Sequence, residues 1–388
     1  MPRHITVVGA TAPSHVHPTH GLVRELTRRG HRVTYAIGEP LVPLVAGAGA
    51  EPVACTTLLP QPGTPWPEEA VPAMALFLDE GMHVLPQLLA ALDADPPDLV
   101  LHDIGGLAGP PAAARWGVPV AQLSPAFVAW EGYEEDMAEH IAAMKAAPEA
   151  DAFYGRFRAW LDEHGVTRSP DDVLGRPEHG IVLIPRLLQP EADRVSADRF
   201  TFVGPVLDEA RLAADPWSPP NGRRVAYIAL GTAFTGGPAF YRACADAFAA
   251  DDGWHVVVSI GARVDAAAIG PVGEHVELHR SAPQLGVLAH ADAFLTHAGM
   301  GSASEALWFG VPTVTHPQAV DQFANAERLA ALGLGRPLTD AADPAAIHAD
   351  LEAVAGDAAL RSRVEAAREE VRSGGGTGRA ADAVEALL

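Results

Sequence analysis

Short apolar runs alternate with helix-forming segments along the chain, and this alternation limits the possible folds more than any other feature. Residues 4–8 form an apolar run, residues 19–29 form an amphipathic segment that ends at Gly30, and residues 31–37 form a second apolar run. A strand, a helix and a second strand in this order make a βαβ unit, which implies a parallel sheet. No G-x-G-x-x-G motif follows the first run, so the dinucleotide-binding fingerprint is absent. The pattern predicts an α/β fold.

The alternation continues in both halves of the chain. Further strands are predicted at 99–102, 118–122, 180–184, 224–230, 255–260, 275–280, 292–296 and 311–315. Helices are predicted at 127–145, 151–164, 238–250 and 303–309, with two helical runs after residue 345 that are broken at 373–376. A loop and a loose helix are expected at 58–86, and the proline-rich stretch 204–223 is interpreted as an interdomain linker.

Length and charge restrict the class of protein. A chain of 388 residues is too long for one ordinary domain, so two domains are expected. The net charge of −22 argues against nucleic acid or an anionic membrane as a partner, because both require a basic face. Cys55 and Cys244 imply no disulfide framework, and no apolar run is long enough to span a bilayer. The expected location is therefore cytoplasmic.

A strand, a glycine turn and a helix follow one another at residues 292–309. Gly299 and Gly301 lie where the backbone N–H groups of the helix start are unpaired, and such a site favours an anion. His297 adds a hydrogen-bond donor at the end of the strand, and a diphosphate is the expected ligand. Ser302 and Glu305 also fit a capping box, in which both side chains only satisfy backbone amides. The polar segment 316–322 follows the next strand, and this favours the ligand site, because open α/β sheets bind ligands at the carboxyl ends of strands.

The loop after the first strand contains three histidines, at positions 15, 17 and 20, with His4 just upstream. These residues have a spacing found in metal sites, but no Cys or acidic ligand lies nearby in the sequence. Exposed loop histidines are a second interpretation. A third is a general base, because neutral imidazole can take a proton from a hydroxyl when a carboxylate holds its other nitrogen. Asp103, at the end of a predicted strand, could supply that carboxylate or could serve only as a turn residue.

The chain resembles the GT-B glycosyltransferases that use nucleotide sugars, and within them the bacterial macrolide glycosyltransferases. The resemblance extends over nearly the whole chain and is carried by the segments 98–103, 122–125, 131–136, 202–205, 229–234, 281–284, 297–305, 310–312 and 321–322. It implies two Rossmann-like domains with parallel sheets that face each other across a cleft. It further implies an acceptor-binding domain at 1–205, a linker at 206–222, a nucleotide-sugar-binding domain at 223–378, and a final helix at 379–388 that returns to the first domain.

The resemblance also assigns roles to individual residues. His15 matches the catalytic base and Asp103 its partner, although Ser14 replaces a usual glycine and His17 stands where asparagine is common. The residues implied in donor binding are Gly231, Thr232, Ser281, Gln284, His297, Gly299, Gly301, Ser302, Glu305, Asp321 and Gln322. Among them, Glu305 is expected to bind the ribose, and Asp321 and Gln322 the sugar. Ser281 replaces a tryptophan that stacks on the base in many relatives, so Arg280 or Arg263 is a candidate for that role.

Five aromatic residues are candidates for the acceptor pocket, although ordinary core packing explains each of them equally well: Trp66, Phe77, Phe127, Trp130 and Tyr133.

The expected function is an inverting, metal-independent transfer of a hexose, from UDP-glucose, to a hydroxyl of a small apolar natural product such as a macrolide. No cofactor is expected besides this co-substrate, no nucleic acid or membrane partner is expected, and formation of a homodimer is left open. The alternatives are a transferase for TDP-deoxysugars, a sugar-nucleotide epimerase, and an inactive nucleotide-sugar-binding partner subunit. The aromatic segment 127–133 argues against the epimerase, and retention of His15 and Asp103 argues against the inactive subunit.

Overall fold

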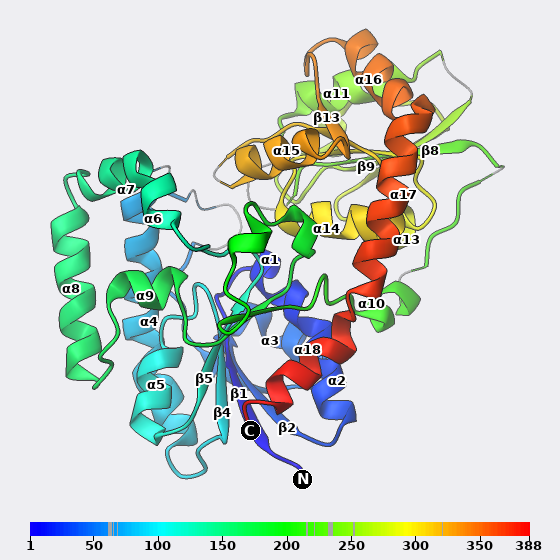
Figure 1. Ribbon diagram of the computed structural model, residues 1–388. Helices are drawn as coiled ribbons and strands as arrows, with labels where there is room; N and C mark the ends of the chain where they lie inside the picture. Colours follow the sequence, from blue (N-terminus) through cyan, green and yellow to red (C-terminus); the bar gives the residue numbers. More distant parts are fainter. Residues whose placement is uncertain are drawn as a thin grey trace. The chain divides into compact units, whose positions relative to one another are not determined.

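The computed structural model divides the chain into two compact units (Figure 1). Unit 1 comprises Met1–Leu207 and Gly374–Leu388, and unit 2 comprises Asp208–Ser373. The structure describes residues 1–60, 64, 66–67, 69–214, 216–220, 222–231, 236–250, 253–319 and 321–388. In these described residues, no helix is both long enough and apolar enough to cross a membrane.

Unit 1 contains a parallel sheet with the strand order β3-β2-β1-β4-β5-β6-β7. Its strands are β1 (His4–Val8), β2 (Arg32–Gly38), β3 (Glu51–Cys55), β4 (Leu99–Asp103), β5 (Val120–Ser124), β6 (Gly180–Val182) and β7 (Phe200–Phe202). In the centre, β1 lies between β2 and β4, with Val8 opposite His102. The loop after β1 therefore begins beside the carboxyl end of β4.

Helices cover both faces of this sheet. The helices of unit 1 are α1 (Pro13–Val16), α2 (His20–Arg28), α3 (Val42–Gly47), α4 (Ala70–Leu92), α5 (Gly109–Trp116), α6 (Tyr133–Asp136), α7 (Ala138–Lys145), α8 (Ala150–Glu163), α9 (Pro170–Gly175) and α18 (Gly376–Glu385). Side chains of α2, α3 and α18 pack in one buried cluster with the sheet, and side chains of α4, α5 and α8 pack in another (Figure 1).

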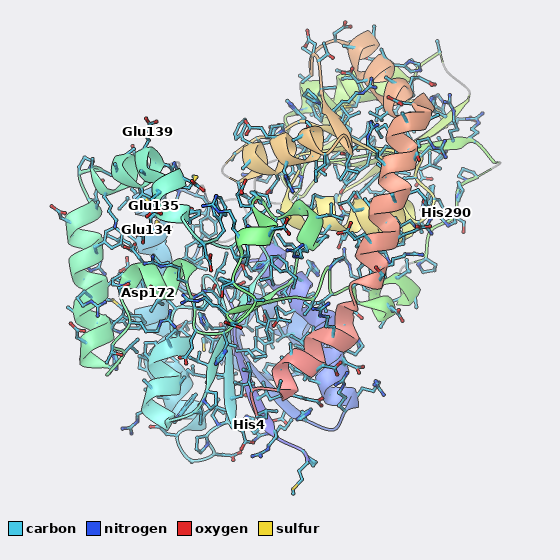
Figure 2. All side chains as sticks on the ribbon, in the orientation of Figure 1. His4, Glu134, Glu135, Glu139, Asp172 and His290 are labelled. Atoms are coloured by element: carbon cyan, nitrogen blue, oxygen red, sulfur yellow. The ribbon has the colours of Figure 1, made fainter. Side chains whose placement is uncertain are left out.

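Two predictions about helices in unit 1 need correction. The helix predicted at 127–145 begins only at Tyr133, because Gly132 precedes it with a φ of +82°, and Met137 separates α6 from α7. Both short helices carry exposed acidic side chains, of which Glu134, Glu135 and Glu139 are labelled in Figure 2. The loose helix expected within 58–86 is a regular helix of 23 residues, α4, which continues through Pro86.

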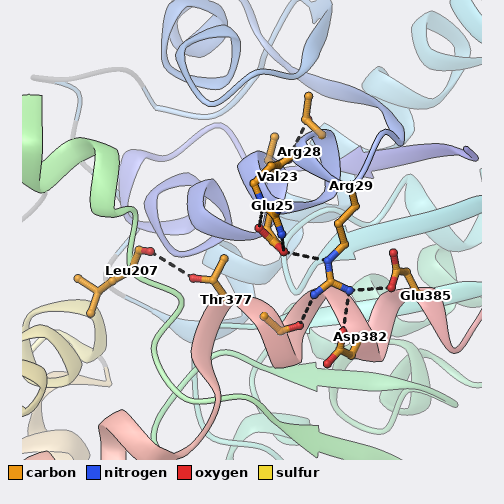
Figure 3. A network of polar contacts seen from close by, with 10 residues as sticks. Val23, Glu25, Arg28, Arg29, Leu207, Thr377, Asp382 and Glu385 are labelled. Atoms are coloured by element: carbon orange, nitrogen blue, oxygen red, sulfur yellow. Dashed lines mark hydrogen bonds and ion pairs between the residues drawn. The ribbon is translucent and has the colours of Figure 1, made fainter.

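The last helix, α18, is fixed to unit 1 by apolar packing and by a polar network. Ala380, Ala381 and Val384 are fully buried against the sheet of unit 1. Arg29 at the end of α2 donates to Asp382 Oδ1 at 2.6 Å, to Glu385 Oε2 at 2.7 Å and to the carbonyl of Gly378 at 3.1 Å (Figure 3). The helix itself begins at Gly376, three residues before the predicted start at residue 379.

Unit 2 contains a second parallel sheet, with the order β10-β9-β8-β11-β12-β13. Its strands are β8 (Arg224–Ala229), β9 (Trp254–Ser259), β10 (Val276–His279), β11 (Ala293–Thr296), β12 (Thr313–Thr315) and β13 (Gly335–Pro337). Its helices are α10 (Glu209–Ala214), α11 (Pro238–Ala247), α12 (Ala266–Ile269), α13 (Gln284–Leu288), α14 (Met300–Phe309), α15 (Gln322–Ala331), α16 (Pro344–Gly356) and α17 (Ala358–Ser373). Here β11 is central, between β8 and β12, so the segments after these strands share one edge.

Local capping explains where unit 2 differs from the prediction. The stretch 206–222 was predicted to be a linker without regular structure, but α10 lies within it, and Asp208 Oδ1 accepts a hydrogen bond from the Ala210 amide at its start. The helical run after residue 345 is divided at Asp357, whose Oδ1 accepts from the amides of Ala359 and Leu360 at 3.0 Å and so starts α17.

Candidate active site

The structure brings His15 and Asp103 together, as the sequence predicted. His15 lies in α1 after β1, and Asp103 is the last residue of β4. His15 Nδ1 donates to Asp103 Oδ1 at 2.9 Å, with the side chain of His15 24% exposed and that of Asp103 only 2% exposed. The Gly105 amide donates to the same Oδ1 at 2.7 Å and fixes the carboxylate. A hydrogen bond at Nδ1 places the basic lone pair of neutral imidazole on Nε2, the nitrogen that can accept a proton.

The other histidines of the first loop do not form a metal site with His15. His4 lies at the opposite end of β1, where its Nε2 contacts Thr34 Oγ1 at 3.0 Å. His17 and His20 pack edge to face, with ring centroids 5.3 Å apart. The described residues contain no group of three or more His, Cys, Asp or Glu side chains that could hold a metal ion.

A buried carboxylate that the sequence analysis missed supports the first loop. Glu80 on α4 is 3% exposed and accepts hydrogen bonds from Thr11 Oγ1 at 3.3 Å, from Thr57 Oγ1 at 2.7 Å and from the Leu58 amide at 2.6 Å. Glu80 thus joins the loops after β1 and β3 to α4, and its contact in the first loop, Thr11, lies four residues before His15. Glu80 lies one helical turn after Phe77, but no local pattern in the sequence identifies its hydrogen-bond partners.

The aromatic acceptor candidates form two groups. The Phe77 ring lies 6.3 Å from the His15 ring and 5.7 Å from the Trp66 ring, so Phe77 contacts the histidine and Trp66 packs against Phe77. Trp130 and Tyr133 pack on each other with centroids 4.9 Å apart, and the Trp130 indole donates to Asp136 Oδ2. Phe127 is half-buried in the segment before them. Direct ring contact places Phe77 at His15.

In unit 2, His297 lies between two glycines at the ends of neighbouring strands. Gly231 follows β8 with a φ of +80°, and a Cβ there would lie 2.6 Å from His297 Nε2. A Cβ at Gly299 would overlap the same nitrogen. Burial lowers the pKa of His297 to about 4, so its imidazole is neutral at physiological pH and can donate a single N–H. Thr232, predicted beside Gly231, lies outside the described residues.

Helix α14 begins three residues after this histidine, at Met300, and its start excludes the capping-box interpretation. Gly299 is the N-cap residue, with no side-chain cap, so Ser302 lies in the first turn rather than at the cap. Gly301 is exposed, and a Cβ added there would meet nothing within 4 Å. The N–H groups of this first turn lack a capping side chain, as an anion-binding helix start requires.

Glu305 belongs to a polar cluster that was only partly predicted. Gln284 Nε2 donates to Glu305 Oε2 and, at 3.4 Å, to Ser302 Oγ. Arg211 on α10 pairs with Glu305 Oε1 at 3.3 Å. Arg211 was missed because its helix was interpreted as part of the linker. The arginine reduces the negative charge of the cluster, and this favours an anionic ligand nearby.

The two residues predicted to bind the sugar have different environments. Asp321 is exposed at the start of α15 and makes no cap bond, while its Oδ2 accepts from Asn325. Gln322 is 6% exposed, and its Oε1 accepts from the amides of Gln318 and Ala319. Its carbonyl oxygen therefore holds the backbone before α15. Ser281 and Arg280 are exposed after β10, and Arg280 donates to the Ala262 carbonyl.

Comparisons with known proteins show the family to which the chain belongs. Residues 244–387 match the family described as the C-terminal domain of erythromycin biosynthesis protein CIII-like proteins. The chain is 42% identical to the oleandomycin glycosyltransferase of Streptomyces antibioticus, over 100% of this chain and 91% of that protein. It is 35% identical to the NDP-glycosyltransferase YjiC of Bacillus subtilis, over 99% and 97% of the two chains.

A solved structure extends the likeness to three dimensions. The crystal structure of the glycosyltransferase of kitacinnamycin is 42% identical, with a TM-score of 0.90 over 100% of this chain and 99% of that one. Identity at this level along the entire length establishes common descent, and the two parallel sheets agree with the fold of that structure. The chain therefore belongs to the GT-B glycosyltransferases, in the family of the bacterial macrolide glycosyltransferases.

Proposed function

We propose that this glycosyltransferase moves a hexose from a UDP-sugar to a hydroxyl of a macrolide-like acceptor, with inversion at the anomeric carbon and His15 as the general base. The observation that carries the proposal is the hydrogen bond of 2.9 Å between His15 Nδ1 and Asp103 Oδ1. The Asp103 carboxylate orients the ring and stabilises the imidazolium that forms when Nε2 takes a proton. The similarity to an oleandomycin glycosyltransferase supports a macrolide as the class of acceptor.

The proposed step balances in atoms and charge. His15 Nε2 takes the proton of the acceptor hydroxyl while that oxygen forms a bond to the anomeric carbon. The bond from this carbon to the diphosphate oxygen breaks, and the nucleoside diphosphate leaves with the electron pair. Attack opposite the leaving group converts an α-linked donor into a β-glycoside. The N–H groups at the start of α14 and the neutral His297 stabilise the charge on the leaving diphosphate.

The proposed base is tested by alanine substitutions. His15→Ala should lower kcat by roughly 10²–10⁴-fold and leave UDP binding intact, because the base contributes to the chemical step alone. Asp103→Ala should lower kcat less. His17→Ala is the matched control in the same loop and should remain active. Full turnover by His15→Ala together with an inactive His17→Ala would contradict the assignment.

The donor is proposed to be UDP-glucose, because Asp321 presents an exposed carboxylate that can accept hydrogen bonds from hexose hydroxyls. A donor without those hydroxyls loses a hydrogen bond to a charged group, which is worth about 1.5–3 kcal/mol. Asp321→Ala should therefore remove the preference for UDP-glucose over UDP while UDP itself binds normally. Equal losses of affinity for both ligands in calorimetry would contradict this role.

One observation favours a second donor class, the TDP-deoxysugars. The carbonyl oxygen of Gln322 is already bonded to two backbone amides, so this residue has less capacity to recognise sugar hydroxyls than its position suggested. A donor with fewer hydroxyls needs fewer such groups. Initial rates with UDP-glucose and with a TDP-deoxysugar at equal concentration distinguish the two classes.

A further inference from the structure

Asn325 is a buried side chain that connects two parts of the proposed donor site. It lies on α15 and is 3% exposed. Its Nδ2 donates to the carbonyl of Ala298 at 3.0 Å and to Oδ2 of Asp321 at 2.9 Å. Both hydrogens of the amide are therefore used, one on the turn before α14 and the other on the carboxylate proposed to bind the sugar.

The first partner, Ala298, has a strained backbone. It is fully buried with a φ of +61°, in the left-handed region that residues with a Cβ rarely adopt. Side chains bond both of its backbone groups: Thr296 Oγ1 accepts from the amide at 3.2 Å, and Asn325 donates to the carbonyl. Such a conformation persists only where its surroundings hold it. This turn sets the direction of the chain between His297 and Gly299.

The second partner, Asp321, is not held by the start of its own helix. It occupies the N-cap position of α15, but its side chain makes no cap hydrogen bond and turns to Asn325 four residues later. An exposed carboxylate without such a bond would sample several rotamers. A charged hydrogen bond from a buried amide restricts it to one of them.

We infer that Asn325 is a positioning residue that couples recognition of the diphosphate to recognition of the sugar. Through Ala298 it maintains the turn that presents His297 and the start of α14, and through Asp321 it orients the carboxylate toward the hexose. This inference rests on the proposed function, because it requires a nucleotide sugar with a diphosphate and a hydroxylated hexose. Asn325 itself need not touch either group.

The hydrogen bonds of Asn325 to Ala298 and to Asp321 predict different losses of ligand affinity in different variants. Asn325→Ala should weaken UDP binding, through Ala298, and should also reduce the ratio of UDP-glucose to UDP affinity, through Asp321. Asp321→Ala should reduce only the ratio. Each effect should be about tenfold, the size expected for loss of one hydrogen bond to a charged or strained partner. In the double variant the ratio should fall no further than in Asp321→Ala, because the second bond acts only through that carboxylate.

Calorimetry with UDP and with UDP-glucose on the full-length variants is the test. Ser304→Ala is the matched control, because Ser304 is 4% exposed on α14 and its hydroxyl has no hydrogen-bond partner among the described residues. It should bind both ligands as the wild type does. Asn325→Asp preserves the shape of the side chain and replaces the donor with an acceptor, so it should reproduce both losses if Asn325→Ala unfolds.

The outcomes separate this inference from the proposed function. Wild-type protein that binds UDP-glucose no better than UDP contradicts the hexose donor, and with it the coupling. A normal wild-type preference that survives in Asn325→Ala and Asn325→Asp contradicts only the role of Asn325. A ratio of UDP-glucose to UDP affinity that falls further in the Asn325 and Asp321 double variant than in Asp321→Ala also overturns it, because the two residues would then act on the sugar independently.

Discussion

At the scale of single residues, the glycines around His297 offer a sharp test of the diphosphate site. A methyl group at Gly299 would overlap Nε2 of His297, whereas nothing lies within 4 Å of a Cβ at Gly301, two residues later. Gly299→Ala should displace the imidazole and lower UDP affinity by about tenfold, through loss of one hydrogen bond to a charged phosphate. Gly301→Ala keeps its amide and should bind UDP normally.

Both variants are compared by calorimetry with UDP, and by thermal unfolding to confirm that each one folds. The Gly301 variant serves as the control for adding a methyl group near the start of α14, and alanine favours a helix more than glycine does. Equal UDP affinity in the two variants would show that His297 does not contact the diphosphate.

The pH dependence of stability follows from another histidine. His102 is buried beside Asp103, and burial lowers its pKa from 6.5 to about 4. In the unfolded chain it takes up a proton as the pH falls below 6.5, while in the native protein it stays neutral down to about pH 4. The native state therefore has its full stability above pH 6.5 and loses up to about 3 kcal/mol from this group as the pH falls to 4.

His102→Gln removes this titration, so the unfolding free energy of the variant should depend less steeply on pH between 6.5 and 4. Urea unfolding at several pH values measures the slope. The slope, rather than the absolute stability, is the readout, because any substitution at this packed position also costs stability at every pH. Parallel curves for variant and wild type would contradict the prediction.

The sequence predicted which residues lie together at the ends of neighbouring strands. It did not predict contacts between residues on elements that are distant in the sequence. Asp103 could be placed near His15 because parallel strands bring their carboxyl ends to one edge, and the structure brings these two residues together. Glu80, Arg211 and Asn325 have no such regularity, because each contacts partners on other elements whose packing no local pattern encodes. The roles of the predicted donor and acceptor residues remain predictions.

At the scale of elements, the attachment of α18 to unit 1 is the feature to test. Arg29 bonds to Asp382, Glu385 and Gly378, and its side chain is 21% exposed. The neighbouring Arg28 pairs with Glu25 on its own helix, and its side chain is 71% exposed. Arg29→Ala should destabilise unit 1 by about 1–2 kcal/mol, and Arg28→Ala by less than about 0.5 kcal/mol.

Chemical unfolding of the two arginine variants under the same conditions checks this difference. Equal stabilities for both would mean that the apolar contacts of α18 alone hold it in place.

Element boundaries were predicted well where the hydrophobic pattern is uninterrupted. The predicted helix 151–164 corresponds to α8, and the predicted strand 224–230 corresponds to β8. The errors lie where one residue interrupts a pattern that otherwise continues, as Gly132 and Asp357 do. Helix α10 was missed because the prolines around it suggested a linker, although Asp208 caps it.

At the scale of the whole molecule, charge limits how the donor can be held. The chain has a net charge of −22, so the overall field repels a nucleotide sugar, and binding must depend on local groups such as the start of α14 and His297. In the proposed mechanism these groups supply the positive potential that Mg²⁺ supplies in other transferases, so we expect activity to survive exhaustive treatment with EDTA. Initial rates before and after chelation measure this. Activity that is lost and returns only with added Mg²⁺ or Zn²⁺ would contradict the prediction.

The path of the chain between the two units also has a consequence for biosynthesis. Unit 2 is one continuous segment, whereas unit 1 is built from residues on both sides of it. During translation, the sheet of unit 1 leaves the ribosome first, but Ala380, Ala381 and Val384, which cover part of its core, are made only after all of unit 2. The apolar surface that α18 covers must therefore stay exposed while the 166 residues of unit 2, Asp208–Ser373, are synthesised. Nascent chains of this architecture should depend on chaperones that bind exposed apolar segments, and the dependence should end when α18 emerges.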